Sequence, residues 1–190
     1  EELKQAQKES VDQGMTQMSY YDALASELSD IVDENGKVKK GYEDRAAFIT
    51  STLKEALGVE ISMTDGVIKG YGNIKKSIQD TIAAKRAKIQ LDAQEALYTE
   101  ALQKQGEVIA TITSLEQEKA NAVAESEAAF QKYTDAILAG NDTEAQIHLQ
   151  QWQRSETTKN KIEGDLSKQQ ELYSMYVYNI GQYEDNMAKF

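Results

Sequence analysis

Apolar residues recur at steps of three and four along most of the chain, which is the spacing of one face of an α-helix. The pattern is interrupted at three places, and the segments between the interruptions predict four helices. These helices are expected to cover residues 1–32, 42–57, 66–138 and 142–190.

Residues that are typical of helix ends mark the first two interruptions. Asn35 and Gly36 supply the left-handed conformations of a tight turn after the first helix. Gly58 is a good terminator for the second helix. Residues 59–63 are then expected to form a short connector, and Thr64 or Ser62 can cap the third helix.

The clearest helix–turn–helix signal lies at residues 139–144. Gly140 ends one helix, and Asn141 with Glu144 three residues later forms a capping box that opens the next. A loop this short makes the two long helices antiparallel neighbours, so residues whose numbers sum to about 281 should lie at one level. The apolar pairs that this register predicts are Phe130 with Trp152, Leu115 with Leu166, and Ile109 with Leu172.

The last helix carries a heptad pattern of bulky residues in its second half. The residues expected in a coiled-coil seam there are Tyr173, Tyr176, Ile180 and Tyr183. The third helix is predicted to be longer than the fourth, so its first third needs other cover. We expect the first two helices, or another copy of the chain, to cover Ile74, Ile78 and Ile82.

The predicted fold is therefore all-α, an elongated antiparallel helical hairpin or coiled coil with a small N-terminal helical subdomain. Residues 1–62 are expected to form the N-terminal helical pair with its Asn-Gly turn. Residues 63–190 are expected to form the long hairpin, with its turn at 139–143.

Composition supports long helices and excludes several kinds of chemistry. None of the 190 residues is Pro, which would kink or end a helix. There is also no Cys and only one His, so the chain has no disulfide, thiol nucleophile, Cys-type zinc site or His cluster. With 21 Lys and Arg against 32 Asp and Glu, the net charge of -11 argues against a nucleic-acid partner. No apolar run reaches the roughly 18 residues of a membrane span.

The loop between the first two helices invites comparison with a calcium-binding loop. If Gly36 took the sixth position of an EF-hand, Ile31 and Tyr42 would stand where oxygen ligands are required. An Asn-Gly turn is therefore the better interpretation. A similar stretch at 65–71 echoes residues 35–42, and two such turns could pack together around Tyr42 and Tyr71, although chance similarity is the simpler explanation.

No catalytic, cofactor-binding or metal-binding residue is assigned. Carboxylates are spread along the acidic helices, and nothing in the pattern builds a pocket around a pair of them. His148 lies four residues before Trp152, which is most simply a packing pair near the hairpin turn. We therefore expect a structural or interaction protein rather than an enzyme.

One long segment resembles a known family. The run LSDIVDENGKVKKGYEDRA at 28–46, LKEALGVE at 53–60, Tyr71 and the basic cluster within 78–88 are similar to a recurrent stretch of phage tail tape measure proteins. The family occurs in siphophages and in prophages of Gram-positive bacteria. The resemblance covers about 75 residues and includes no catalytic motif.

The resemblance implies a segment of a long helical protein that lies in the lumen of the tail tube and helps to set tail length during assembly. Its location would be the virion, and the host cytoplasm before assembly. Its partners would be the tail tube, the tail assembly chaperones and other copies of itself. The chain begins at Glu1 rather than Met, so we expect it to be a piece of a longer protein.

Two alternatives from other classes stay open. One is a coiled-coil scaffold or adaptor that binds a protein partner through its tyrosine stripe. The other is a secreted helical-hairpin protein of the type VII export kind, although the Trp-x-Gly turn of that class is absent, because Arg154 stands two residues after Trp152. A hairpin that folds back also spans less length per residue than a straight helix that measures the tail. The predicted turn therefore means either a locally compact region along the tape measure protein or a hairpin that opens in the assembled tail.

Overall fold

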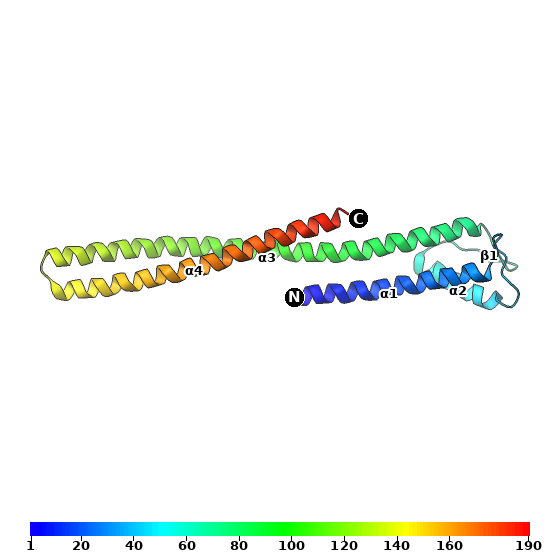
Figure 1. Ribbon diagram of the computed structural model, residues 1–190, viewed down its shortest axis with the longest axis horizontal. Helices are drawn as coiled ribbons and strands as arrows, with labels where there is room; N and C mark the ends of the chain where they lie inside the picture. The colour runs from blue at the N-terminus through cyan, green and yellow to red at the C-terminus, as the bar shows by residue number, and fades with distance from the viewer. The chain divides into compact units, whose positions relative to one another are not determined.

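The computed structural model describes residues 1–190 and confirms the all-α prediction (Figure 1). The four helices are α1 (Glu2–Ile31), α2 (Glu43–Leu57), α3 (Tyr71–Leu138) and α4 (Asp142–Met187), and the two strands are β1 (Met63–Thr64) and β2 (Val67–Ile68). Two compact units share α3. Unit 1 comprises residues 1–97 and 186–190, and unit 2 comprises residues 98–185.

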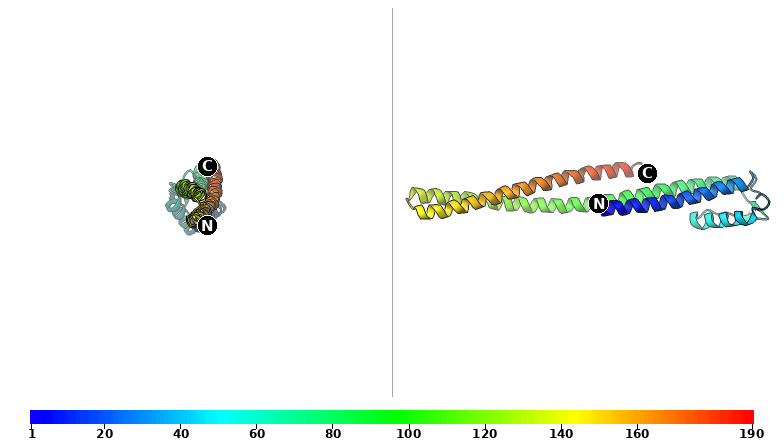
Figure 2. Two further views of the ribbon diagram at one scale, coloured as in Figure 1. Left: turned by 90° about the vertical axis from the view of Figure 1, so that its left-hand side faces the viewer. Right: turned by 60° about the horizontal axis from the view of Figure 1, so that its bottom comes forward.

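Unit 1 has the larger hydrophobic core. Its α1 runs antiparallel to the first part of α3, as ion pairing of Asp22 with Arg86 and hydrogen bonding of Ser29 with Lys75 show. The short α2 lies beside α1 and packs on it (Figure 2). The fully buried side chains of this core are Leu28, Ile49, Leu53, Ile68, Ile78 and Ile82.

This core supplies the cover that the first third of α3 needs. Ile78 and Ile82 are buried and Ile74 is half-buried, all against the core that α1 and α2 supply within the same chain. Residues 63–97 therefore belong with the N-terminal helices, and the structure divides the chain after Leu97 rather than after residue 62.

The third helix begins at Tyr71, five residues later than predicted, because residues 63–68 form a small antiparallel hairpin. Met63 pairs with Ile68 and Thr64 with Val67. Its turn needs left-handed backbone at Asp65 and Gly66, with φ of 53° and 71°. Such short strands leave no periodic signal in a sequence.

The turn at Asn35-Gly36 packs against this hairpin. The Ile68 amide donates to the Gly36 carbonyl at 2.7 Å, and the Val38 amide donates to the Gly66 carbonyl at 2.8 Å. The two similar turns thus lie together. Only one of the two tyrosines enters the core, however, since Tyr71 is buried and Tyr42 is exposed.

Asp33 has a local structural role in the same loop. Its Oδ1 accepts hydrogen bonds from the amides of Asn35 and Lys37, both at 2.9 Å. The carboxylate therefore closes an Asx turn.

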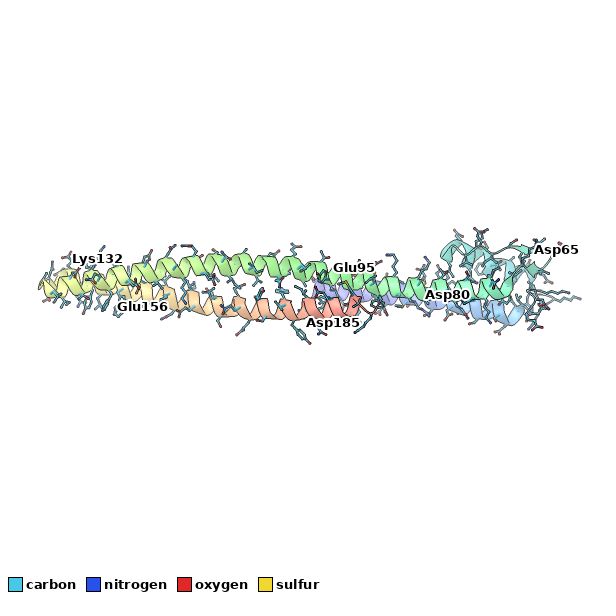
Figure 3. All side chains as sticks on the ribbon, turned by 90° about the horizontal axis from the view of Figure 1, so that it is seen from above. Asp65, Asp80, Glu95, Lys132, Glu156 and Asp185 are labelled. Atoms are coloured by element: carbon cyan, nitrogen blue, oxygen red, sulfur yellow. The ribbon has the colours of Figure 1, made fainter.

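Unit 2 is the predicted antiparallel hairpin. α3 ends at Leu138, Gly140 adopts a φ of 71°, and α4 begins at Asp142. The Glu144 amide donates to Asn141 Oδ1 at 3.2 Å, and Asn141 Nδ2 donates to Glu144 Oε2 at 2.7 Å, which completes the predicted capping box. Figure 3 shows Lys132 on α3 and Glu156 on α4 near this turn. α4 ends at Met187 rather than at the last residue.

Candidate functional site: the hairpin seam

A heptad of buried and half-buried residues joins α3 to α4 in unit 2 and is interrupted only at the exposed Tyr173. The α3 members are Ala101, Gln105, Val108, Ile112, Leu115, Lys119, Ala122, Ser126, Ala129, Tyr133 and Ala136. The α4 members are Ala145, His148, Trp152, Ser155, Lys159, Ile162, Leu166, Gln169, Tyr176, Ile180 and Tyr183. We refer to these residues as the seam.

The predicted register agrees with the observed contacts to within one residue along the hairpin. The Phe130 and Trp152 rings lie 5.2 Å apart between centroids. Leu115 packs against the cluster that contains Leu166. At the far end of unit 2, Tyr98 Oη lies 3.2 Å from Glu184 Oε1.

The predicted pair of Ile109 and Leu172 is not in the seam. These side chains are 47% and 38% exposed, and the neighbouring Val108 is buried instead. Two adjacent residues share a level on the helix axis but point about 100° apart. The register therefore predicts which residues share a level along the helix axes, but not which way their side chains point.

The tyrosine stripe is only partly covered. Tyr176, Ile180 and Tyr183 are half-buried, while Tyr173 is 37% exposed. Tyr178 lies off the heptad and is exposed. The seam in this half of the hairpin is therefore open on one side.

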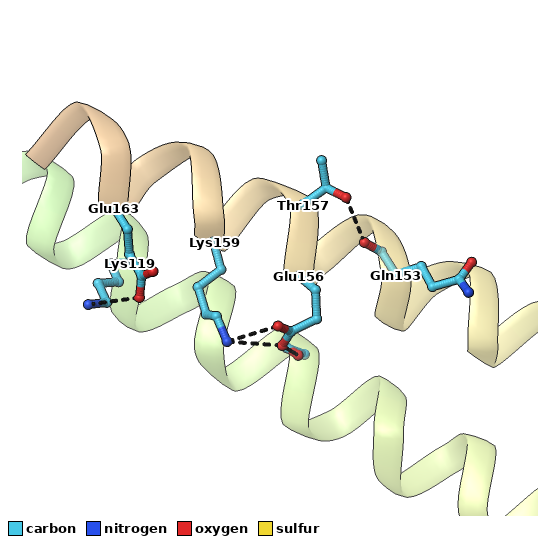
Figure 4. A network of polar contacts seen from close by, with 7 residues as sticks. Lys119, Gln153, Glu156, Thr157, Lys159 and Glu163 are labelled. Carbon is cyan, nitrogen blue, oxygen red and sulfur yellow. Dashed lines mark hydrogen bonds and ion pairs between the residues drawn. The ribbon is translucent and has the colours of Figure 1, made fainter.

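Polar residues at the middle of the seam were not foreseen. Ser126 Oγ donates to Glu156 Oε1 at 2.6 Å, and Lys159 Nζ lies 2.9 Å from Glu156 Oε2 (Figure 4). One level away, Lys119 Nζ lies 3.2 Å from Glu163 Oε1. These residues form a polar belt between the two apolar ends of the seam.

The belt shifts the ionisation of its members. The hydrogen bonds from Ser126 and then Lys159 hold the pKa of Glu156 below its usual value. The hydrogen bond to Glu156 raises the pKa of Lys159. Both shifts favour the charged pair at neutral pH.

Unit 1 contains a small cleft of about 260 Å³ beside α1 and α3, with Ser29, Tyr71 and Lys75 on its wall. Lys75 Nζ donates to Ser29 Oγ at 2.9 Å. Burial raises the pKa of Tyr71, against a smaller opposite effect from the hydrogen bond with Ser29. These polar groups satisfy one another and do not form a nucleophile–base pair.

No group of three or more His, Cys, Asp or Glu side chains is placed to hold a metal ion. None of the helices combines the length and the apolar character that a membrane crossing requires.

Comparison with known proteins adds no relative. No family model matches the chain, and neither a curated protein nor a solved structure is significantly similar to it. The arrangement of helices is therefore the basis on which a function is proposed.

Proposed function

We propose that the chain is a structural segment of a phage tail tape measure protein, which helps to set tail length during assembly and lies in the lumen of the tail tube. The observation that carries the proposal is the length of uninterrupted helix. α3 runs for 68 residues and α4 for 46 without a break. At a rise of 1.5 Å per residue, α3 alone has a contour of about 100 Å.

A helix is a physical ruler because its length is proportional to its number of residues. A kink would break this proportionality. The chain contains no Pro in 190 residues, so it lacks the residue that most often kinks a helix. The net charge of -11 also keeps the segment from holding tightly to DNA that later occupies the same lumen. The resemblance of residues 29–102 to the family supports the same proposal.

The partners that follow from this proposal are the tail tube, the tail assembly chaperones and other copies of the chain. The location that follows is the virion, with the host cytoplasm before assembly. We propose no catalytic activity, because carboxylates that are held in place by close contacts, such as Glu156, already have partners in the polar belt.

Whether the hairpin is closed or open determines how much axial length each residue contributes. While α3 and α4 are paired, two residues at one level contribute a single rise of about 1.5 Å. If the hairpin opened, every residue would contribute its own rise. The two arrangements therefore differ by a factor of two in length per residue.

A paired duplication tests the proposal in the phage or prophage that encodes the segment. Duplicating residues 105–132 in α3 and 149–176 in α4 adds four heptads at matching levels and leaves the register of the seam intact. Tail length is then measured by electron microscopy. A closed hairpin should lengthen the tail by about 42 Å, and an open one by about 84 Å.

A flexible Gly–Ser insert of the same total length at Gly140 is the matched control. It adds residues without adding helix, so a ruler made of paired helices should keep its length. Tails of unchanged length after the paired duplication would overturn the proposed function.

A second candidate function is a coiled-coil scaffold that binds a protein partner through the C-terminal half of α4. The observation in its favour is the group of exposed large side chains in this half, namely Met175, Val177 and Tyr178. Normal tail length after the paired duplication, together with loss of a partner on substitution of these residues, would favour this candidate.

A further inference from the structure

One face of the hairpin in unit 2 is apolar at both ends and acidic in the middle. Its residues each follow a seam residue by one position, so they line the groove beside the seam. We define the groove face as Leu102, Ile109, Glu116, Val123 and Phe130 of α3 with Leu149, Glu156, Glu163, Gln170 and Val177 of α4.

Observed contacts place the α3 residues and the α4 residues of the groove face on the same side of the hairpin. Glu156 and Glu163 reach from α4 to Ser126 and Lys119 on α3 (Figure 4). Phe130 reaches from α3 to Trp152 on α4. The ends of the groove face stay uncovered, since Leu102, Phe130 and Val177 are all more than 40% exposed.

A second stripe on α4 has the complementary pattern. It consists of Ile147, Arg154, Lys161, Lys168 and Met175, all exposed, and we call it the basic stripe. Its ends are apolar and its middle is cationic, whereas the groove face has apolar ends and an acidic middle.

Three of the charges at the centre of the two surfaces have no partner within the chain. Glu116 on the groove face makes no hydrogen bond or ion pair, and neither do Arg154 and Lys161 on the basic stripe. Lys168 has only a long contact with Asp165, at 4.0 Å.

A chain cannot bring its own basic stripe to its own groove face. Each stripe residue stands two positions before a groove residue of α4, for example Ile147 before Leu149 and Lys161 before Glu163. Two residues correspond to about 200° around a helix. The two surfaces therefore lie on opposite sides of the hairpin, and a second molecule is needed to join them.

We propose that the groove face binds α4 of a second copy of this chain through the basic stripe, with both copies pointing in the same direction and shifted along the helix axis by about 3 Å. This helix-in-groove contact buries the four apolar ends and pairs the central charges. It does not depend on the proposed function.

The register follows from the two stripes. The partner helix runs parallel to α4 of the first copy and is shifted by two residues, about 3 Å, along its axis. Met175 then lies over Leu102 and Val177, and Ile147 lies over Phe130 and Leu149.

The charges meet in the same register. Lys161 lies over Glu116 and Glu163, and Arg154 lies over Glu156. Glu156 and Glu163 already hold Lys159 and Lys119, but a carboxylate has lone pairs for further donors. In this direction Lys168 lies over Ile109 and Gln170, but it already contacts Asp165 at 4.0 Å. In the opposite direction Arg154, which has no partner within the chain, would lie there instead, with no carboxylate to meet it.

The contact joins different surfaces on the two copies, so it is heterologous. Each bound copy still offers one free groove face and one free basic stripe. Such a contact builds a closed ring if its rotation closes and an open array if it does not. The stripe covers about 40 Å of helix from Ile147 to Met175.

The absence of cysteine from the chain makes a disulfide test direct. The full chain carrying Leu102→Cys is mixed with the full chain carrying Met175→Cys under mild oxidation. The expected result is a mixed dimer in at least about tenfold excess over the yield from a matched control. The control replaces Met175→Cys with Ser174→Cys, which lies about 100° away on the same helix.

Charge reversal supplies an independent readout by light scattering over a range of concentrations. Lys161→Glu and Glu116→Lys are each expected to weaken association about tenfold, and the double variant is expected to restore it. Because neither residue has a partner within the chain, the helical content of each variant should match that of the parent chain.

Three results would overturn the proposal. The first is a monomer at all concentrations, and the second is a mixed-dimer yield equal to that of the Ser174→Cys control. The third is preferential linkage of Leu102→Cys with Ile147→Cys, which would show copies pointing in opposite directions.

Discussion

At the scale of single residues, Gly36 is a point of close contact between the two turns of unit 1. It has a φ of 85°, and a Cβ atom added there would lie 2.1 Å from the Ile68 carbonyl oxygen. Gly41 has a similar φ of 92° but faces open space. The two glycines therefore separate the cost of close packing from the cost of left-handed backbone.

We expect Gly36→Ala to lower the free energy of unfolding by about 3 kcal/mol or more, because the turn must move away from β2. Gly41→Ala should cost about 1 kcal/mol from its backbone conformation alone. Urea unfolding followed by circular dichroism measures both. Equal costs for the two variants would show that the turns do not pack as described.

Tyr71 links the core of unit 1 to pH. Burial raises its pKa in the folded state, so its contribution to stability is complete below the unfolded pKa of about 10 and is lost as pH rises through the folded value. The parent chain should therefore lose more stability between pH 8 and pH 11 than Tyr71→Phe does. Urea midpoints at the two pH values measure this, and an equal loss in both chains would contradict the assignment.

At the scale of elements, helix positions were predictable and the small strands were not. The periodicity at 142–190 and the capping box at Asn141 depend on neighbours within a few residues, so the sequence alone specifies them. β1 and β2 depend on the Asn35-Gly36 turn across more than 25 residues of chain, and no local pattern records that contact.

The same limit applies to the candidate site. Small residues such as Ala101, Ala129 and Ala136 form much of the α3 side of the seam, but they carry little apolar signal. The pattern favoured the large Ile109 as the seam residue, whereas the smaller neighbour Val108 is the one that is buried. The polar belt was missed because Lys119 and Glu156 are, in a sequence, indistinguishable from ordinary surface charges.

Two substitutions on α4 can distinguish a residue that is buried in the seam from one that is exposed beside it. Leu166 is 7% exposed within the seam, so we expect Leu166→Ala to lower the free energy of unfolding by about 2–3 kcal/mol. Leu172→Ala removes the same atoms from an exposed position and should cost less than about 1 kcal/mol. Equal costs in thermal or urea unfolding would place Leu172 in the seam after all.

At the scale of the whole molecule, the two units differ in how much apolar surface they bury. The unit 1 core draws on α1, α2, β2 and α3. The buried cluster of unit 2 contains only Ala122, Ile162 and Leu166. Stability should therefore differ along the chain, and even along α3.

Native-state hydrogen exchange should show this difference. Amides around Ile49, Leu53 and Ile78 are expected to exchange more slowly than those around Leu115 and Leu166, because local opening of the hairpin exposes less apolar surface. The opposite order would mean that the seam, rather than the unit 1 core, is the most stable part of the chain.

The closed register of α3 and α4 is the central claim, because both proposals depend on which residues share a level. Spin labels at Thr111→Cys and Leu172→Cys measure it directly by pulsed electron resonance. With helix axes 8–10 Å apart, the closed hairpin predicts a single distance below about 30 Å. An open, continuous helix would separate the labels by about 90 Å, and that result would contradict the account.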